Sequence, residues 1–542
     1  MPTLAGWLTG EQVPNEIIEQ TLTAMGSVLG QHGGNPGRIV QPGFGLITFS
    51  EPAYAMRESI EAPVLDWVPD RRTLVYRRPL SGTHMLYYIA DWPAEGNLLF
   101  ATEIKALFAV GVPRRLHLAA LDALSRYGFI PAPWTAFQDV CVVPAGSILR
   151  WQKAQTLMNS ATDYSFDPLP PDTDVLDSLY ALLDKTTAAL LPSHEQLVTL
   201  MDSDTASALL TSLSAPHVEK PFTIVTIGYK KNGMEGASLE AERLSFTYQC
   251  PLLSITGVDA PEFWPTTIQA LEAPCVDSSL LALHQLIHTT SIETGARVAI
   301  SGLGATTLFG TMLNPLTETK RAQQDVLAWH AHNPSRQPWT NRTQLWSKNA
   351  AQLISQQESW EQTLHAKKLA RKAMQFSQDW QRKYYLNLHL DMPDLIVGPA
   401  EQLAAFDRTA LRFPYLATDV MNLITRLPIT LPDGISKEAL LERLAKRVLP
   451  DYRPQAKATP TRPPLQTVGT LRAPTASLLN IRDSELLQQT LSQEALKETG
   501  IFDPEAVHNL LSQHPQNGNI APRELLLVFT TQLLCQIFGT HL

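Results

Sequence analysis

The chain has 542 residues, 44% of them hydrophobic and 18% charged, and its formal net charge is −9. A globular chain of this length exceeds one hydrophobic core, so we expect two domains, the second with a helical extension. The acidic balance argues against a nucleic-acid partner, which needs a basic footprint. No apolar run approaches the roughly 20 residues of a membrane span, and the N-terminus shows no signal segment, so we expect a cytoplasmic protein.

The spacing of the cysteines and histidines predicts neither disulfides nor a zinc site. The four cysteines are widely spaced and form no CxxC pair. We therefore expect reduced, mostly buried thiols and no structural metal.

Residues 1–158 predict a domain of short strands separated by Gly/Pro turns, with two short helices. The expected strands are Leu4–Leu8, Gly45–Phe49, Thr73–Tyr76, Met85–Ile89 and Asn97–Thr102, and the expected helices are Glu103–Val110 and Leu118–Tyr127. Residues 159–173 are rich in Pro, Asp and Ser, which indicates a linker.

Residues 174–315 alternate between strand and helix, which predicts a doubly wound parallel sheet. The expected strands are Leu197–Leu200, Phe222–Ile227, Leu252–Ile255 and Val298–Ser301, and the expected helices are Val175–Leu190, Ala206–Leu213, Ala237–Phe246, Phe263–Leu271 and Ser279–Glu293. Ligands of such sheets bind beyond the carboxyl ends of the strands, where the loops Met201–Thr205 and Ser301–Thr307 fall.

Residues 316–542 are expected to be mainly helical. The predicted helices are Gln323–His330, Gln344–Lys367, Ala370–Asn387, Ile435–Val448, Asp503–Leu511 and Arg523–Phe538.

Several motifs occur in the order of a known family: LLFATEIKAL, PFTIVTIGY, EAPCVDSS, VAISGLGATTLFG, RFPYLATDV and GISKEALLERL. In these the chain resembles the asparagine synthetase B family, which includes β-lactam synthetases and lasso-peptide cyclases. The resemblance implies an N-terminal-nucleophile-type αββα glutaminase domain. It also implies an ATP-pyrophosphatase-like α/β domain that adenylates a carboxylate with ATP and Mg²⁺ and transfers it to an amine.

The positions of the glutaminase site depart from the family pattern. The family begins Met-Cys-Gly-Ile, whereas this chain begins Met1-Pro2-Thr3-Leu4, and its nearest cysteine is Cys141. Pro79 stands where a substrate-gripping carboxylate is expected, and no Asn-Gly-Glu oxyanion segment occurs between Glu51 and Thr73. Without nucleophile or oxyanion donor, we expect no glutamine hydrolysis.

The pyrophosphate loop of the family, Ser-Gly-Gly-x-Asp-Ser-Ser, aligns with residues 201–207, which read MDSDTAS. Gly allows backbone N–H groups to approach phosphates, and it is absent here. Asp202 and Asp204 instead place negative charge beside a polyanion. The repulsion between two like charges 4 Å apart costs roughly 4 kcal/mol at an effective dielectric of 20. A solvated or helix-capping loop is favoured over a new metal site on Asp202 or Asp204, although a one-residue slip would put Asp204 on the metal position.

The second metal-binding segment is altered in the same way. The family reads Ser-Gly-Glu-Gly-Ala-Asp-Glu, whereas residues 301–307 read SGLGATT and contain no acid. Threonine hydroxyls do not replace carboxylates as ligands of Mg²⁺ held between phosphates. The candidate nucleotide positions that remain are Ser203, Asp204, Ser207, Ser301 and Gly302.

Three polar residues match the substrate and transfer positions of the family. Asp277 and Ser279 match the substrate segment, and Lys437 matches a lysine that stabilises the transfer step, while the second family lysine is replaced by Pro399. A solvated helix-start lysine explains Lys437 equally well. For three further histidines we expect no partner and no role: His84, His284 and His288.

Two functions from different classes follow from these departures, and a third is open. The first is a pseudoenzyme that serves as a binding or scaffold partner in a biosynthetic pathway. Its partner would be an active enzyme of that pathway, a peptide or a small molecule, and it could form a homodimer. No cofactor is expected for this function. The second is a repurposed ATP- and Mg²⁺-dependent amide- or ring-forming ligase that uses Lys437, Asp277 and a metal on Asp202 or Asp204. The third is chemistry without ATP in the same cleft.

Overall fold

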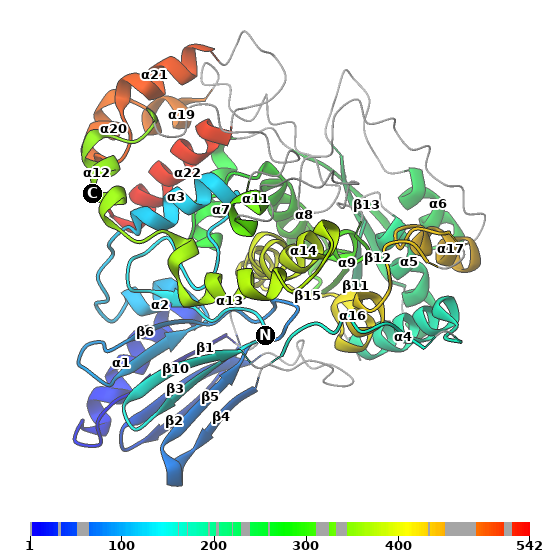
Figure 1. Ribbon diagram of the computed structural model, residues 1–542, viewed down its shortest axis with the longest axis horizontal. Coiled ribbons are helices and arrows are strands. Elements are labelled where there is room, and N and C mark those ends of the chain that lie inside the picture. The colour runs from blue at the N-terminus through cyan, green and yellow to red at the C-terminus, as the bar shows by residue number, and fades with distance from the viewer. Residues whose placement is uncertain are drawn as a thin grey trace.

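The computed structural model describes most of the chain (Figure 1). The described ranges are 3–30, 34–50, 64–160, 162–170, 172–192, 196–201, 205–218, 221–228, 239–257, 261–310, 325–331, 344–431, 434–449, 484–513 and 523–542. Within these ranges no helix has the length and apolar character that crossing a membrane requires.

The N-terminal half, residues 3–160, contains two antiparallel sheets. The six-stranded sheet has the order β2-β3-β1-β7-β6-β8, and the four-stranded sheet has the order β10-β9-β5-β4. The strands are β1 (Thr3–Leu8), β2 (Asn35–Gln41), β3 (Phe44–Ser50), β4 (Val64–Val68), β5 (Thr73–Arg77), β6 (Tyr87–Ala90), β7 (Leu98–Ala101), β8 (Cys141–Val142), β9 (Ser147–Gln152) and β10 (Gln155–Ser160).

An apolar core lies between the two sheets, and helices cover the outer face of the six-stranded sheet. Alternate residues such as Leu8, Phe44 and Leu98 fill the space between the sheets. Helices α1 (Asn15–Leu29) and α2 (Ile104–Phe108) pack on the other face. Helix α1 and the strands β2, β4 and β10 were not predicted from the sequence. The second helical layer of the expected αββα arrangement is not found on the four-stranded sheet among the described residues.

The C-terminal half, residues 172–542, is built on a five-stranded parallel sheet with the order β13-β12-β11-β14-β15. This confirms the α/β class and the parallel sheet. The strands are β11 (Leu197–Met201), β12 (Thr223–Gly228), β13 (Leu252–Thr256), β14 (Val298–Ser301) and β15 (Ala410–Arg412). Strand β15 was not predicted, because three residues carry too little pattern to indicate a strand.

The helices up to residue 308 follow the predicted alternation with strands, and those after residue 325 form the part that was expected to be mainly helical. They are α4 (Val175–Leu190), α5 (Thr205–Ser214), α6 (Leu239–Tyr248), α7 (Trp264–Leu271), α8 (Ser278–Thr294), α9 (Ala305–Leu308), α11 (Val326–Ala331), α15 (Gly398–Phe406), α16 (Thr418–Thr425), α17 (Ala439–Val448), α19 (Glu485–Thr490), α20 (Gln493–Thr499), α21 (Pro504–Gln513) and α22 (Arg523–Phe538).

Two predicted long helices are interrupted. The segment expected as Gln344–Lys367 consists of α12 (Lys348–Gln356), a 3-10 turn and α13 (Leu364–Ala373). The break arises because the hydroxyls of Ser359 and Thr363 accept N–H groups three residues on and start new helical turns. The following helix α14 (Asp379–Leu386) passes into a π-helix at Asn387–Val397 that contains Pro393.

The segment between the halves is anchored by its aromatic residues. The Tyr164 hydroxyl donates to the Leu80 carbonyl at 3.1 Å, and its ring lies 5.0 Å from that of His389. The Phe166 ring packs 4.9 Å from that of Phe376. One continuous apolar cluster contains buried side chains of both halves, including Leu107, Leu124, Leu271 and Phe529.

Candidate functional site

The loops after β11 and β14 lie at the switch point of the parallel sheet. The chain adds β12 and β13 on one side of β11 and then places β14 on the other side. At such a point two neighbouring loops leave in opposite directions and open a crevice for ligands. Asp202, Ser203 and Asp204, which follow β11, lie outside the described residues, and α5 begins directly after them.

The structure brings Ser207, Ser301 and Gly302 together, as the resemblance implies. A Cβ on Gly302 would lie 3.0 Å from the backbone nitrogen of Ser207, so the β14 loop lies directly on the first turn of α5. The Ser301 hydroxyl accepts the N–H of Leu303 at 3.2 Å, and both serines are buried. Only a residue without a side chain permits this approach of the two loops.

A third segment, which follows β15, contacts both loops. Sequence reasoning did not assign this segment to the site. The Tyr415 hydroxyl donates to the carbonyl of Ala206 at 3.0 Å. Gly304 has φ +87°, and a Cβ there would lie 2.7 Å from Leu416. The sequence signal for this contact was the RFPYL motif itself, in which a large aromatic residue follows a short strand.

The positions that carry metal-binding acids in the resembled family form no Mg²⁺ site in the described loop. Leu303 is 4% exposed and belongs to the main apolar core, and Thr307 is also buried. Nowhere in the described ranges do three His, Cys, Asp or Glu side chains gather as metal ligands would. An aliphatic side chain and two hydroxyls do not supply the carboxylate oxygens that Mg²⁺ requires, so the residues present here do not fit this ion.

Lys437 is buried close to the same region. It is 2% exposed, and its Nζ lies 4.3 Å from the centroid of the Tyr384 ring. The Tyr384 hydroxyl donates to the carbonyl of Leu308, at the end of the helix that follows the β14 loop. Burial lowers the pKa of Lys437 to about 7, and among the described residues no carboxylate forms an ion pair with it. Such an amine can accept a proton near neutral pH.

A comparison with protein families matches the asparagine synthase family to residues 182–536 of this sequence. The chain belongs to the asparagine synthase family. A comparison with curated proteins finds no match. The matched region contains the whole five-stranded sheet and the loops at its switch point, and members of this family form amide bonds with ATP.

In the asparagine synthase region, Asp277 and Ser279 form the start of helix α8. The Asp277 Oδ1 accepts the backbone N–H of Ser279 at 2.9 Å and its hydroxyl at 2.6 Å, so the aspartate caps the helix. The Cys275 thiol donates to the Asp277 carbonyl at 3.1 Å. Asp277 also lines a cavity of about 90 Å³ between the two halves.

Two further buried carboxylates line this cavity beside Asp277, and sequence reasoning missed both. Glu272 accepts the N–H groups of Ile104 and Lys105 at 2.7 and 2.8 Å and so caps α2 in the opposite half. Burial raises its pKa to about 7 even though the Lys105 ammonium lies 4.0 Å away. Asp394 accepts the N–H of Ala132 at 2.9 Å, and burial raises its pKa to about 6. Their burial depends on contacts between the halves, which no local pattern reveals.

The segment that contains Gly82 packs against the π-helix of the C-terminal half. A Cβ on Gly82, which has φ +90°, would lie 2.4 Å from Pro393. The fully buried Arg78 donates to the carbonyls of Val143, Gly82 and Thr83, and its Nη1 lies 4.0 Å from the Asp394 carboxylate.

The expectation that three histidines lack partners is wrong. The backbone N–H of His84 donates to Glu401, whose carboxylate lies 3.3 Å from the imidazole. Both His284 and His288 contact Asp407, at 3.3 and 2.7 Å, and His284 also bonds the Thr267 hydroxyl. The partners lie on α15 and at its C-terminal end, far along the sequence, so local patterns could not show them.

Proposed function

We propose that this member of the asparagine synthase family is a pseudoenzyme that binds a partner in a biosynthetic pathway and neither hydrolyses glutamine nor adenylates a carboxylate with Mg²⁺-ATP. The observation that carries this proposal is Leu303. Its side chain is packed in the apolar core at a position where the resembled family has a carboxylate. A leucine side chain offers no oxygen ligand to Mg²⁺, and its packing in the core supports adaptation of this loop to packing rather than to ion binding.

The N-terminal half supports the same proposal. Pro79 has no side-chain acceptor for a substrate amine, and the Gly82 backbone is in direct contact with Pro393. The nearby Arg78 already donates to three backbone carbonyls. The region therefore makes contacts between the halves where a glutaminase would bind its substrate.

Helix α13 offers a surface for such a partner. Its buried face carries Ala366, Leu369 and Ala373, while four cations are exposed on the opposite face beside Leu364, which is 88% exposed. These cations are Lys367, Lys368, Arg371 and Lys372. In a chain of net charge −9, this surface favours an acidic segment of another protein. A second copy of this chain is the alternative partner.

Calorimetry of the purified protein with ATP, with and without Mg²⁺, tests the proposal. We expect no heat of binding at millimolar nucleotide under either condition. Micromolar binding that requires Mg²⁺ and is abolished by Asp204→Ala would overturn the proposal, because it would mean that the loop after β11 still holds a nucleotide and metal. Glu242→Ala, which changes an exposed acid on α6, is the matched control.

Lys437 favours a second candidate, an ATP-dependent amide- or ring-forming ligase. A buried lysine with a lowered pKa beside the sheet's ligand edge is the group that such a transfer step needs. In this case Lys437→Met would abolish product formation on an acyl acceptor while leaving nucleotide binding within about twofold, whereas Lys446→Met, on the exposed face of α17, would change neither.

A further inference from the structure

Strand β13 (Leu252–Thr256) forms one edge of the parallel sheet and differs from the strand at the other edge. The opposite edge strand, β15, is buried along its whole length, whereas Ser254 and Thr256 of β13 are exposed. Edge strands commonly carry Pro, Lys or other charged residues that prevent another chain from pairing with them. The β13 sequence, LLSIT, contains neither Pro nor a charged residue, so this edge is open to pairing with a further strand.

The hydrogen bonds at the two ends of β13 show which of its backbone groups face outward. The N–H of Ile224 donates to the Pro251 carbonyl at 2.9 Å, and the N–H of Gly257 donates to the Gly228 carbonyl at 2.8 Å. Because every second residue of a strand bonds the same neighbour, the N–H and C=O groups of three residues point away from β12: Leu252, Ser254 and Thr256. In the described ranges these groups have no hydrogen-bond partner. An extended strand is the kind of partner that satisfies such a row of donors and acceptors.

Helix α6 (Leu239–Tyr248) carries an apolar ridge beside the same edge. Phe246 is 87% exposed and Leu239 is 82% exposed, and because they are seven residues apart they lie on one face of the helix. The helix packs on β12 and β13, and Figure 1 shows it at the periphery of the C-terminal half. Large apolar side chains that are exposed together next to an open strand edge indicate an interface.

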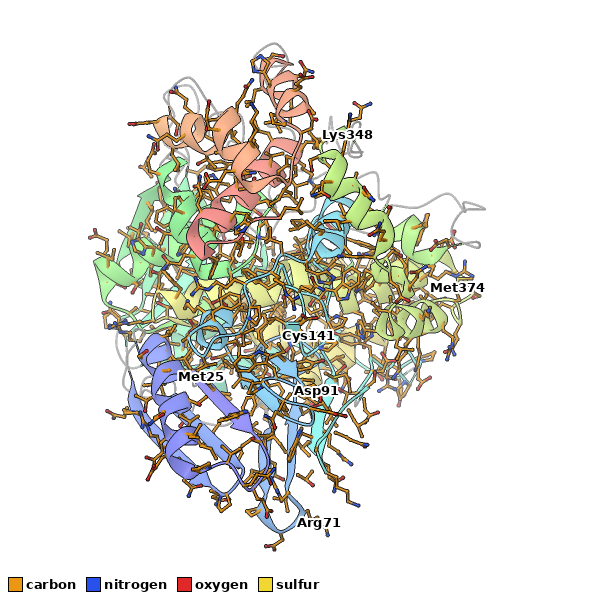
Figure 2. All side chains as sticks on the ribbon, turned by 90° about the vertical axis from the view of Figure 1, so that its left-hand side faces the viewer. Met25, Arg71, Asp91, Cys141, Lys348 and Met374 are labelled. Carbon is orange, nitrogen blue, oxygen red and sulfur yellow. The ribbon has the colours of Figure 1, made fainter. Side chains whose placement is uncertain are left out.

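Other exposed apolar side chains lack this combination. Met374, which Figure 2 shows at the periphery of the helical part, lies at the C-terminal end of α13, after the four exposed cations of that helix. Helix α13 packs with α11, α14 and the 3-10 turn that precedes it. Its surface therefore favours a charged partner, whereas the β13 edge favours an uncharged strand.

A second copy of β13 matches this edge. Antiparallel pairing about a two-fold axis at Ser254 places Ser254 opposite itself and Leu252 opposite Thr256 of the second copy. Each pair joins residues whose N–H and C=O groups both point outward, so each pair exchanges two hydrogen bonds. The parallel sheets of the two copies would then form one continuous sheet.

The same axis brings the two α6 helices to packing distance. A helix that covers β12 and β13 lies over the line between them, so the two copies of α6 are separated by two strand spacings, about 9.6 Å. Helices pack at about 8–10 Å. Because α6 runs opposite to β13 and has a similar length of about 15 Å, the middles of the two elements lie at the same height. Leu239 then faces Phe246 of the second copy, and Glu242 faces Arg243.

The area and charge of this surface suit a second copy. Burying Phe246 of both copies removes about 300–400 Å² of apolar surface from water, which is about a fifth of the roughly 1,600 Å² of a standard interface. Leu239 and the paired strands add to this area. A strongly charged partner is disfavoured, because the ridge carries Glu242 and Arg243 side by side.

We propose that two copies of this chain associate through β13 and α6 as an isologous dimer in which the two parallel sheets join. This interface shares no residue with the basic face of α13 or with the loops at the switch point of the sheet. It is therefore independent of the function proposed above.

Disulfide trapping of the full chain tests the register of the two strands. An antiparallel hydrogen-bonded pair has Cα atoms about 5.5 Å apart, within the range of a disulfide. Ser254→Cys should therefore form an intermolecular disulfide on mild oxidation, seen by non-reducing electrophoresis. Thr256→Cys, which would lie opposite Leu252 of the second copy, should not exceed the background from the four native cysteines. Equal cross-linking of the two variants would overturn the proposal.

Sedimentation velocity of the full chain tests the helix contact. We expect a dimer at micromolar concentration, and we expect Phe246→Glu to raise its dissociation constant at least about tenfold. Leu364→Glu is the matched control, because Leu364 is 88% exposed on α13 and the change in charge is the same. It should leave the dissociation constant within about twofold. A native chain that stays monomeric at high micromolar concentration, or an equal effect of both variants, would overturn the proposal.

Discussion

At the interface between the halves, the buried acids Glu272 and Asp394 each accept backbone N–H groups and face a cation. Near the switch point of the sheet, the buried Lys437 faces the ring of Tyr384 and none of the described carboxylates. The hydrogen bonds that these acids accept tie residues of the two halves together. A buried charge without such partners destabilises the fold, and is retained where an absent ligand or a reaction uses it. The comparison therefore separates two acids that join the halves from a buried amine with no ion-pair partner among the described residues.

The strongest test of the interface removes its buried cation. Arg78→Met leaves Asp394 without its cation and three carbonyls without their donor, so we expect the free energy of unfolding to fall by about 3–5 kcal/mol. Urea denaturation followed by circular dichroism measures this loss. Arg150→Met, on an exposed position of β9, is the control and should change stability by no more than about 0.5 kcal/mol. A loss below about 1 kcal/mol for Arg78→Met would mean that the interface does not depend on this cation.

The pH dependence of folding stability tests whether Lys437 is a buried amine without an ion-pair partner. Its pKa is about 7 in the folded protein, against 10.5 for a solvated lysine, so between these values the unfolded chain binds more protons. The stability of the native protein should therefore rise across this interval by up to about 1.4 kcal/mol per pH unit. Lys437→Met should be more stable than the native protein at pH 7, and the difference should shrink towards pH 10. Lys446→Met should leave the profile unchanged, and a flat native profile would contradict the assignment of an unpaired amine.

For Glu272 we expect the opposite slope of folding stability against pH. Its pKa is about 7 in the folded protein, against 4.5 for a solvated glutamate, so the folded protein binds more protons between these values and its stability falls as pH rises through them. Glu272→Gln cannot ionise and should flatten this part of the profile in thermal denaturation. Exposed Glu242→Gln serves as the control. A steeper fall in Glu272→Gln would mean that the charged form of Glu272 is the stable one.

The contact between the two loops predicts the smallest effect. Gly302→Ala places a Cβ 3.0 Å from the Ser207 nitrogen, and because a backbone atom cannot move aside easily, we expect a loss of about 1–2 kcal/mol. At Gly10 the nearest atom is the end of the flexible Gln12 side chain, so Gly10→Ala should be nearly neutral in the same denaturation assay. Equal effects of both changes would show that the loops do not touch as closely as described.

Much of the parallel sheet could be predicted from the sequence, because buried strands such as Val298–Ser301 read as short apolar runs between helical patterns. The meeting of Ser207 with Gly302 also followed from the rule that ligand loops leave the carboxyl ends of neighbouring strands. Helix α1 could have been recognised from its apolar spacing but was missed. The carboxylates Glu272 and Asp394 could not be recognised, because their burial and their N–H partners come from residues more than 150 positions away.

The continuous apolar cluster shared by the two halves has a consequence for the history of this chain. A gene that loses the chemistry of one domain can ordinarily discard that domain. Here Leu107 and Leu124 of the N-terminal half belong to the same cluster as Leu271 and Phe529, and Glu272 caps a helix of the opposite half. Deleting the first 160 residues would leave that apolar surface in water and those charges unmatched. The N-terminal half is then inherited as part of the scaffold of its neighbour, whether or not it retains a reaction of its own.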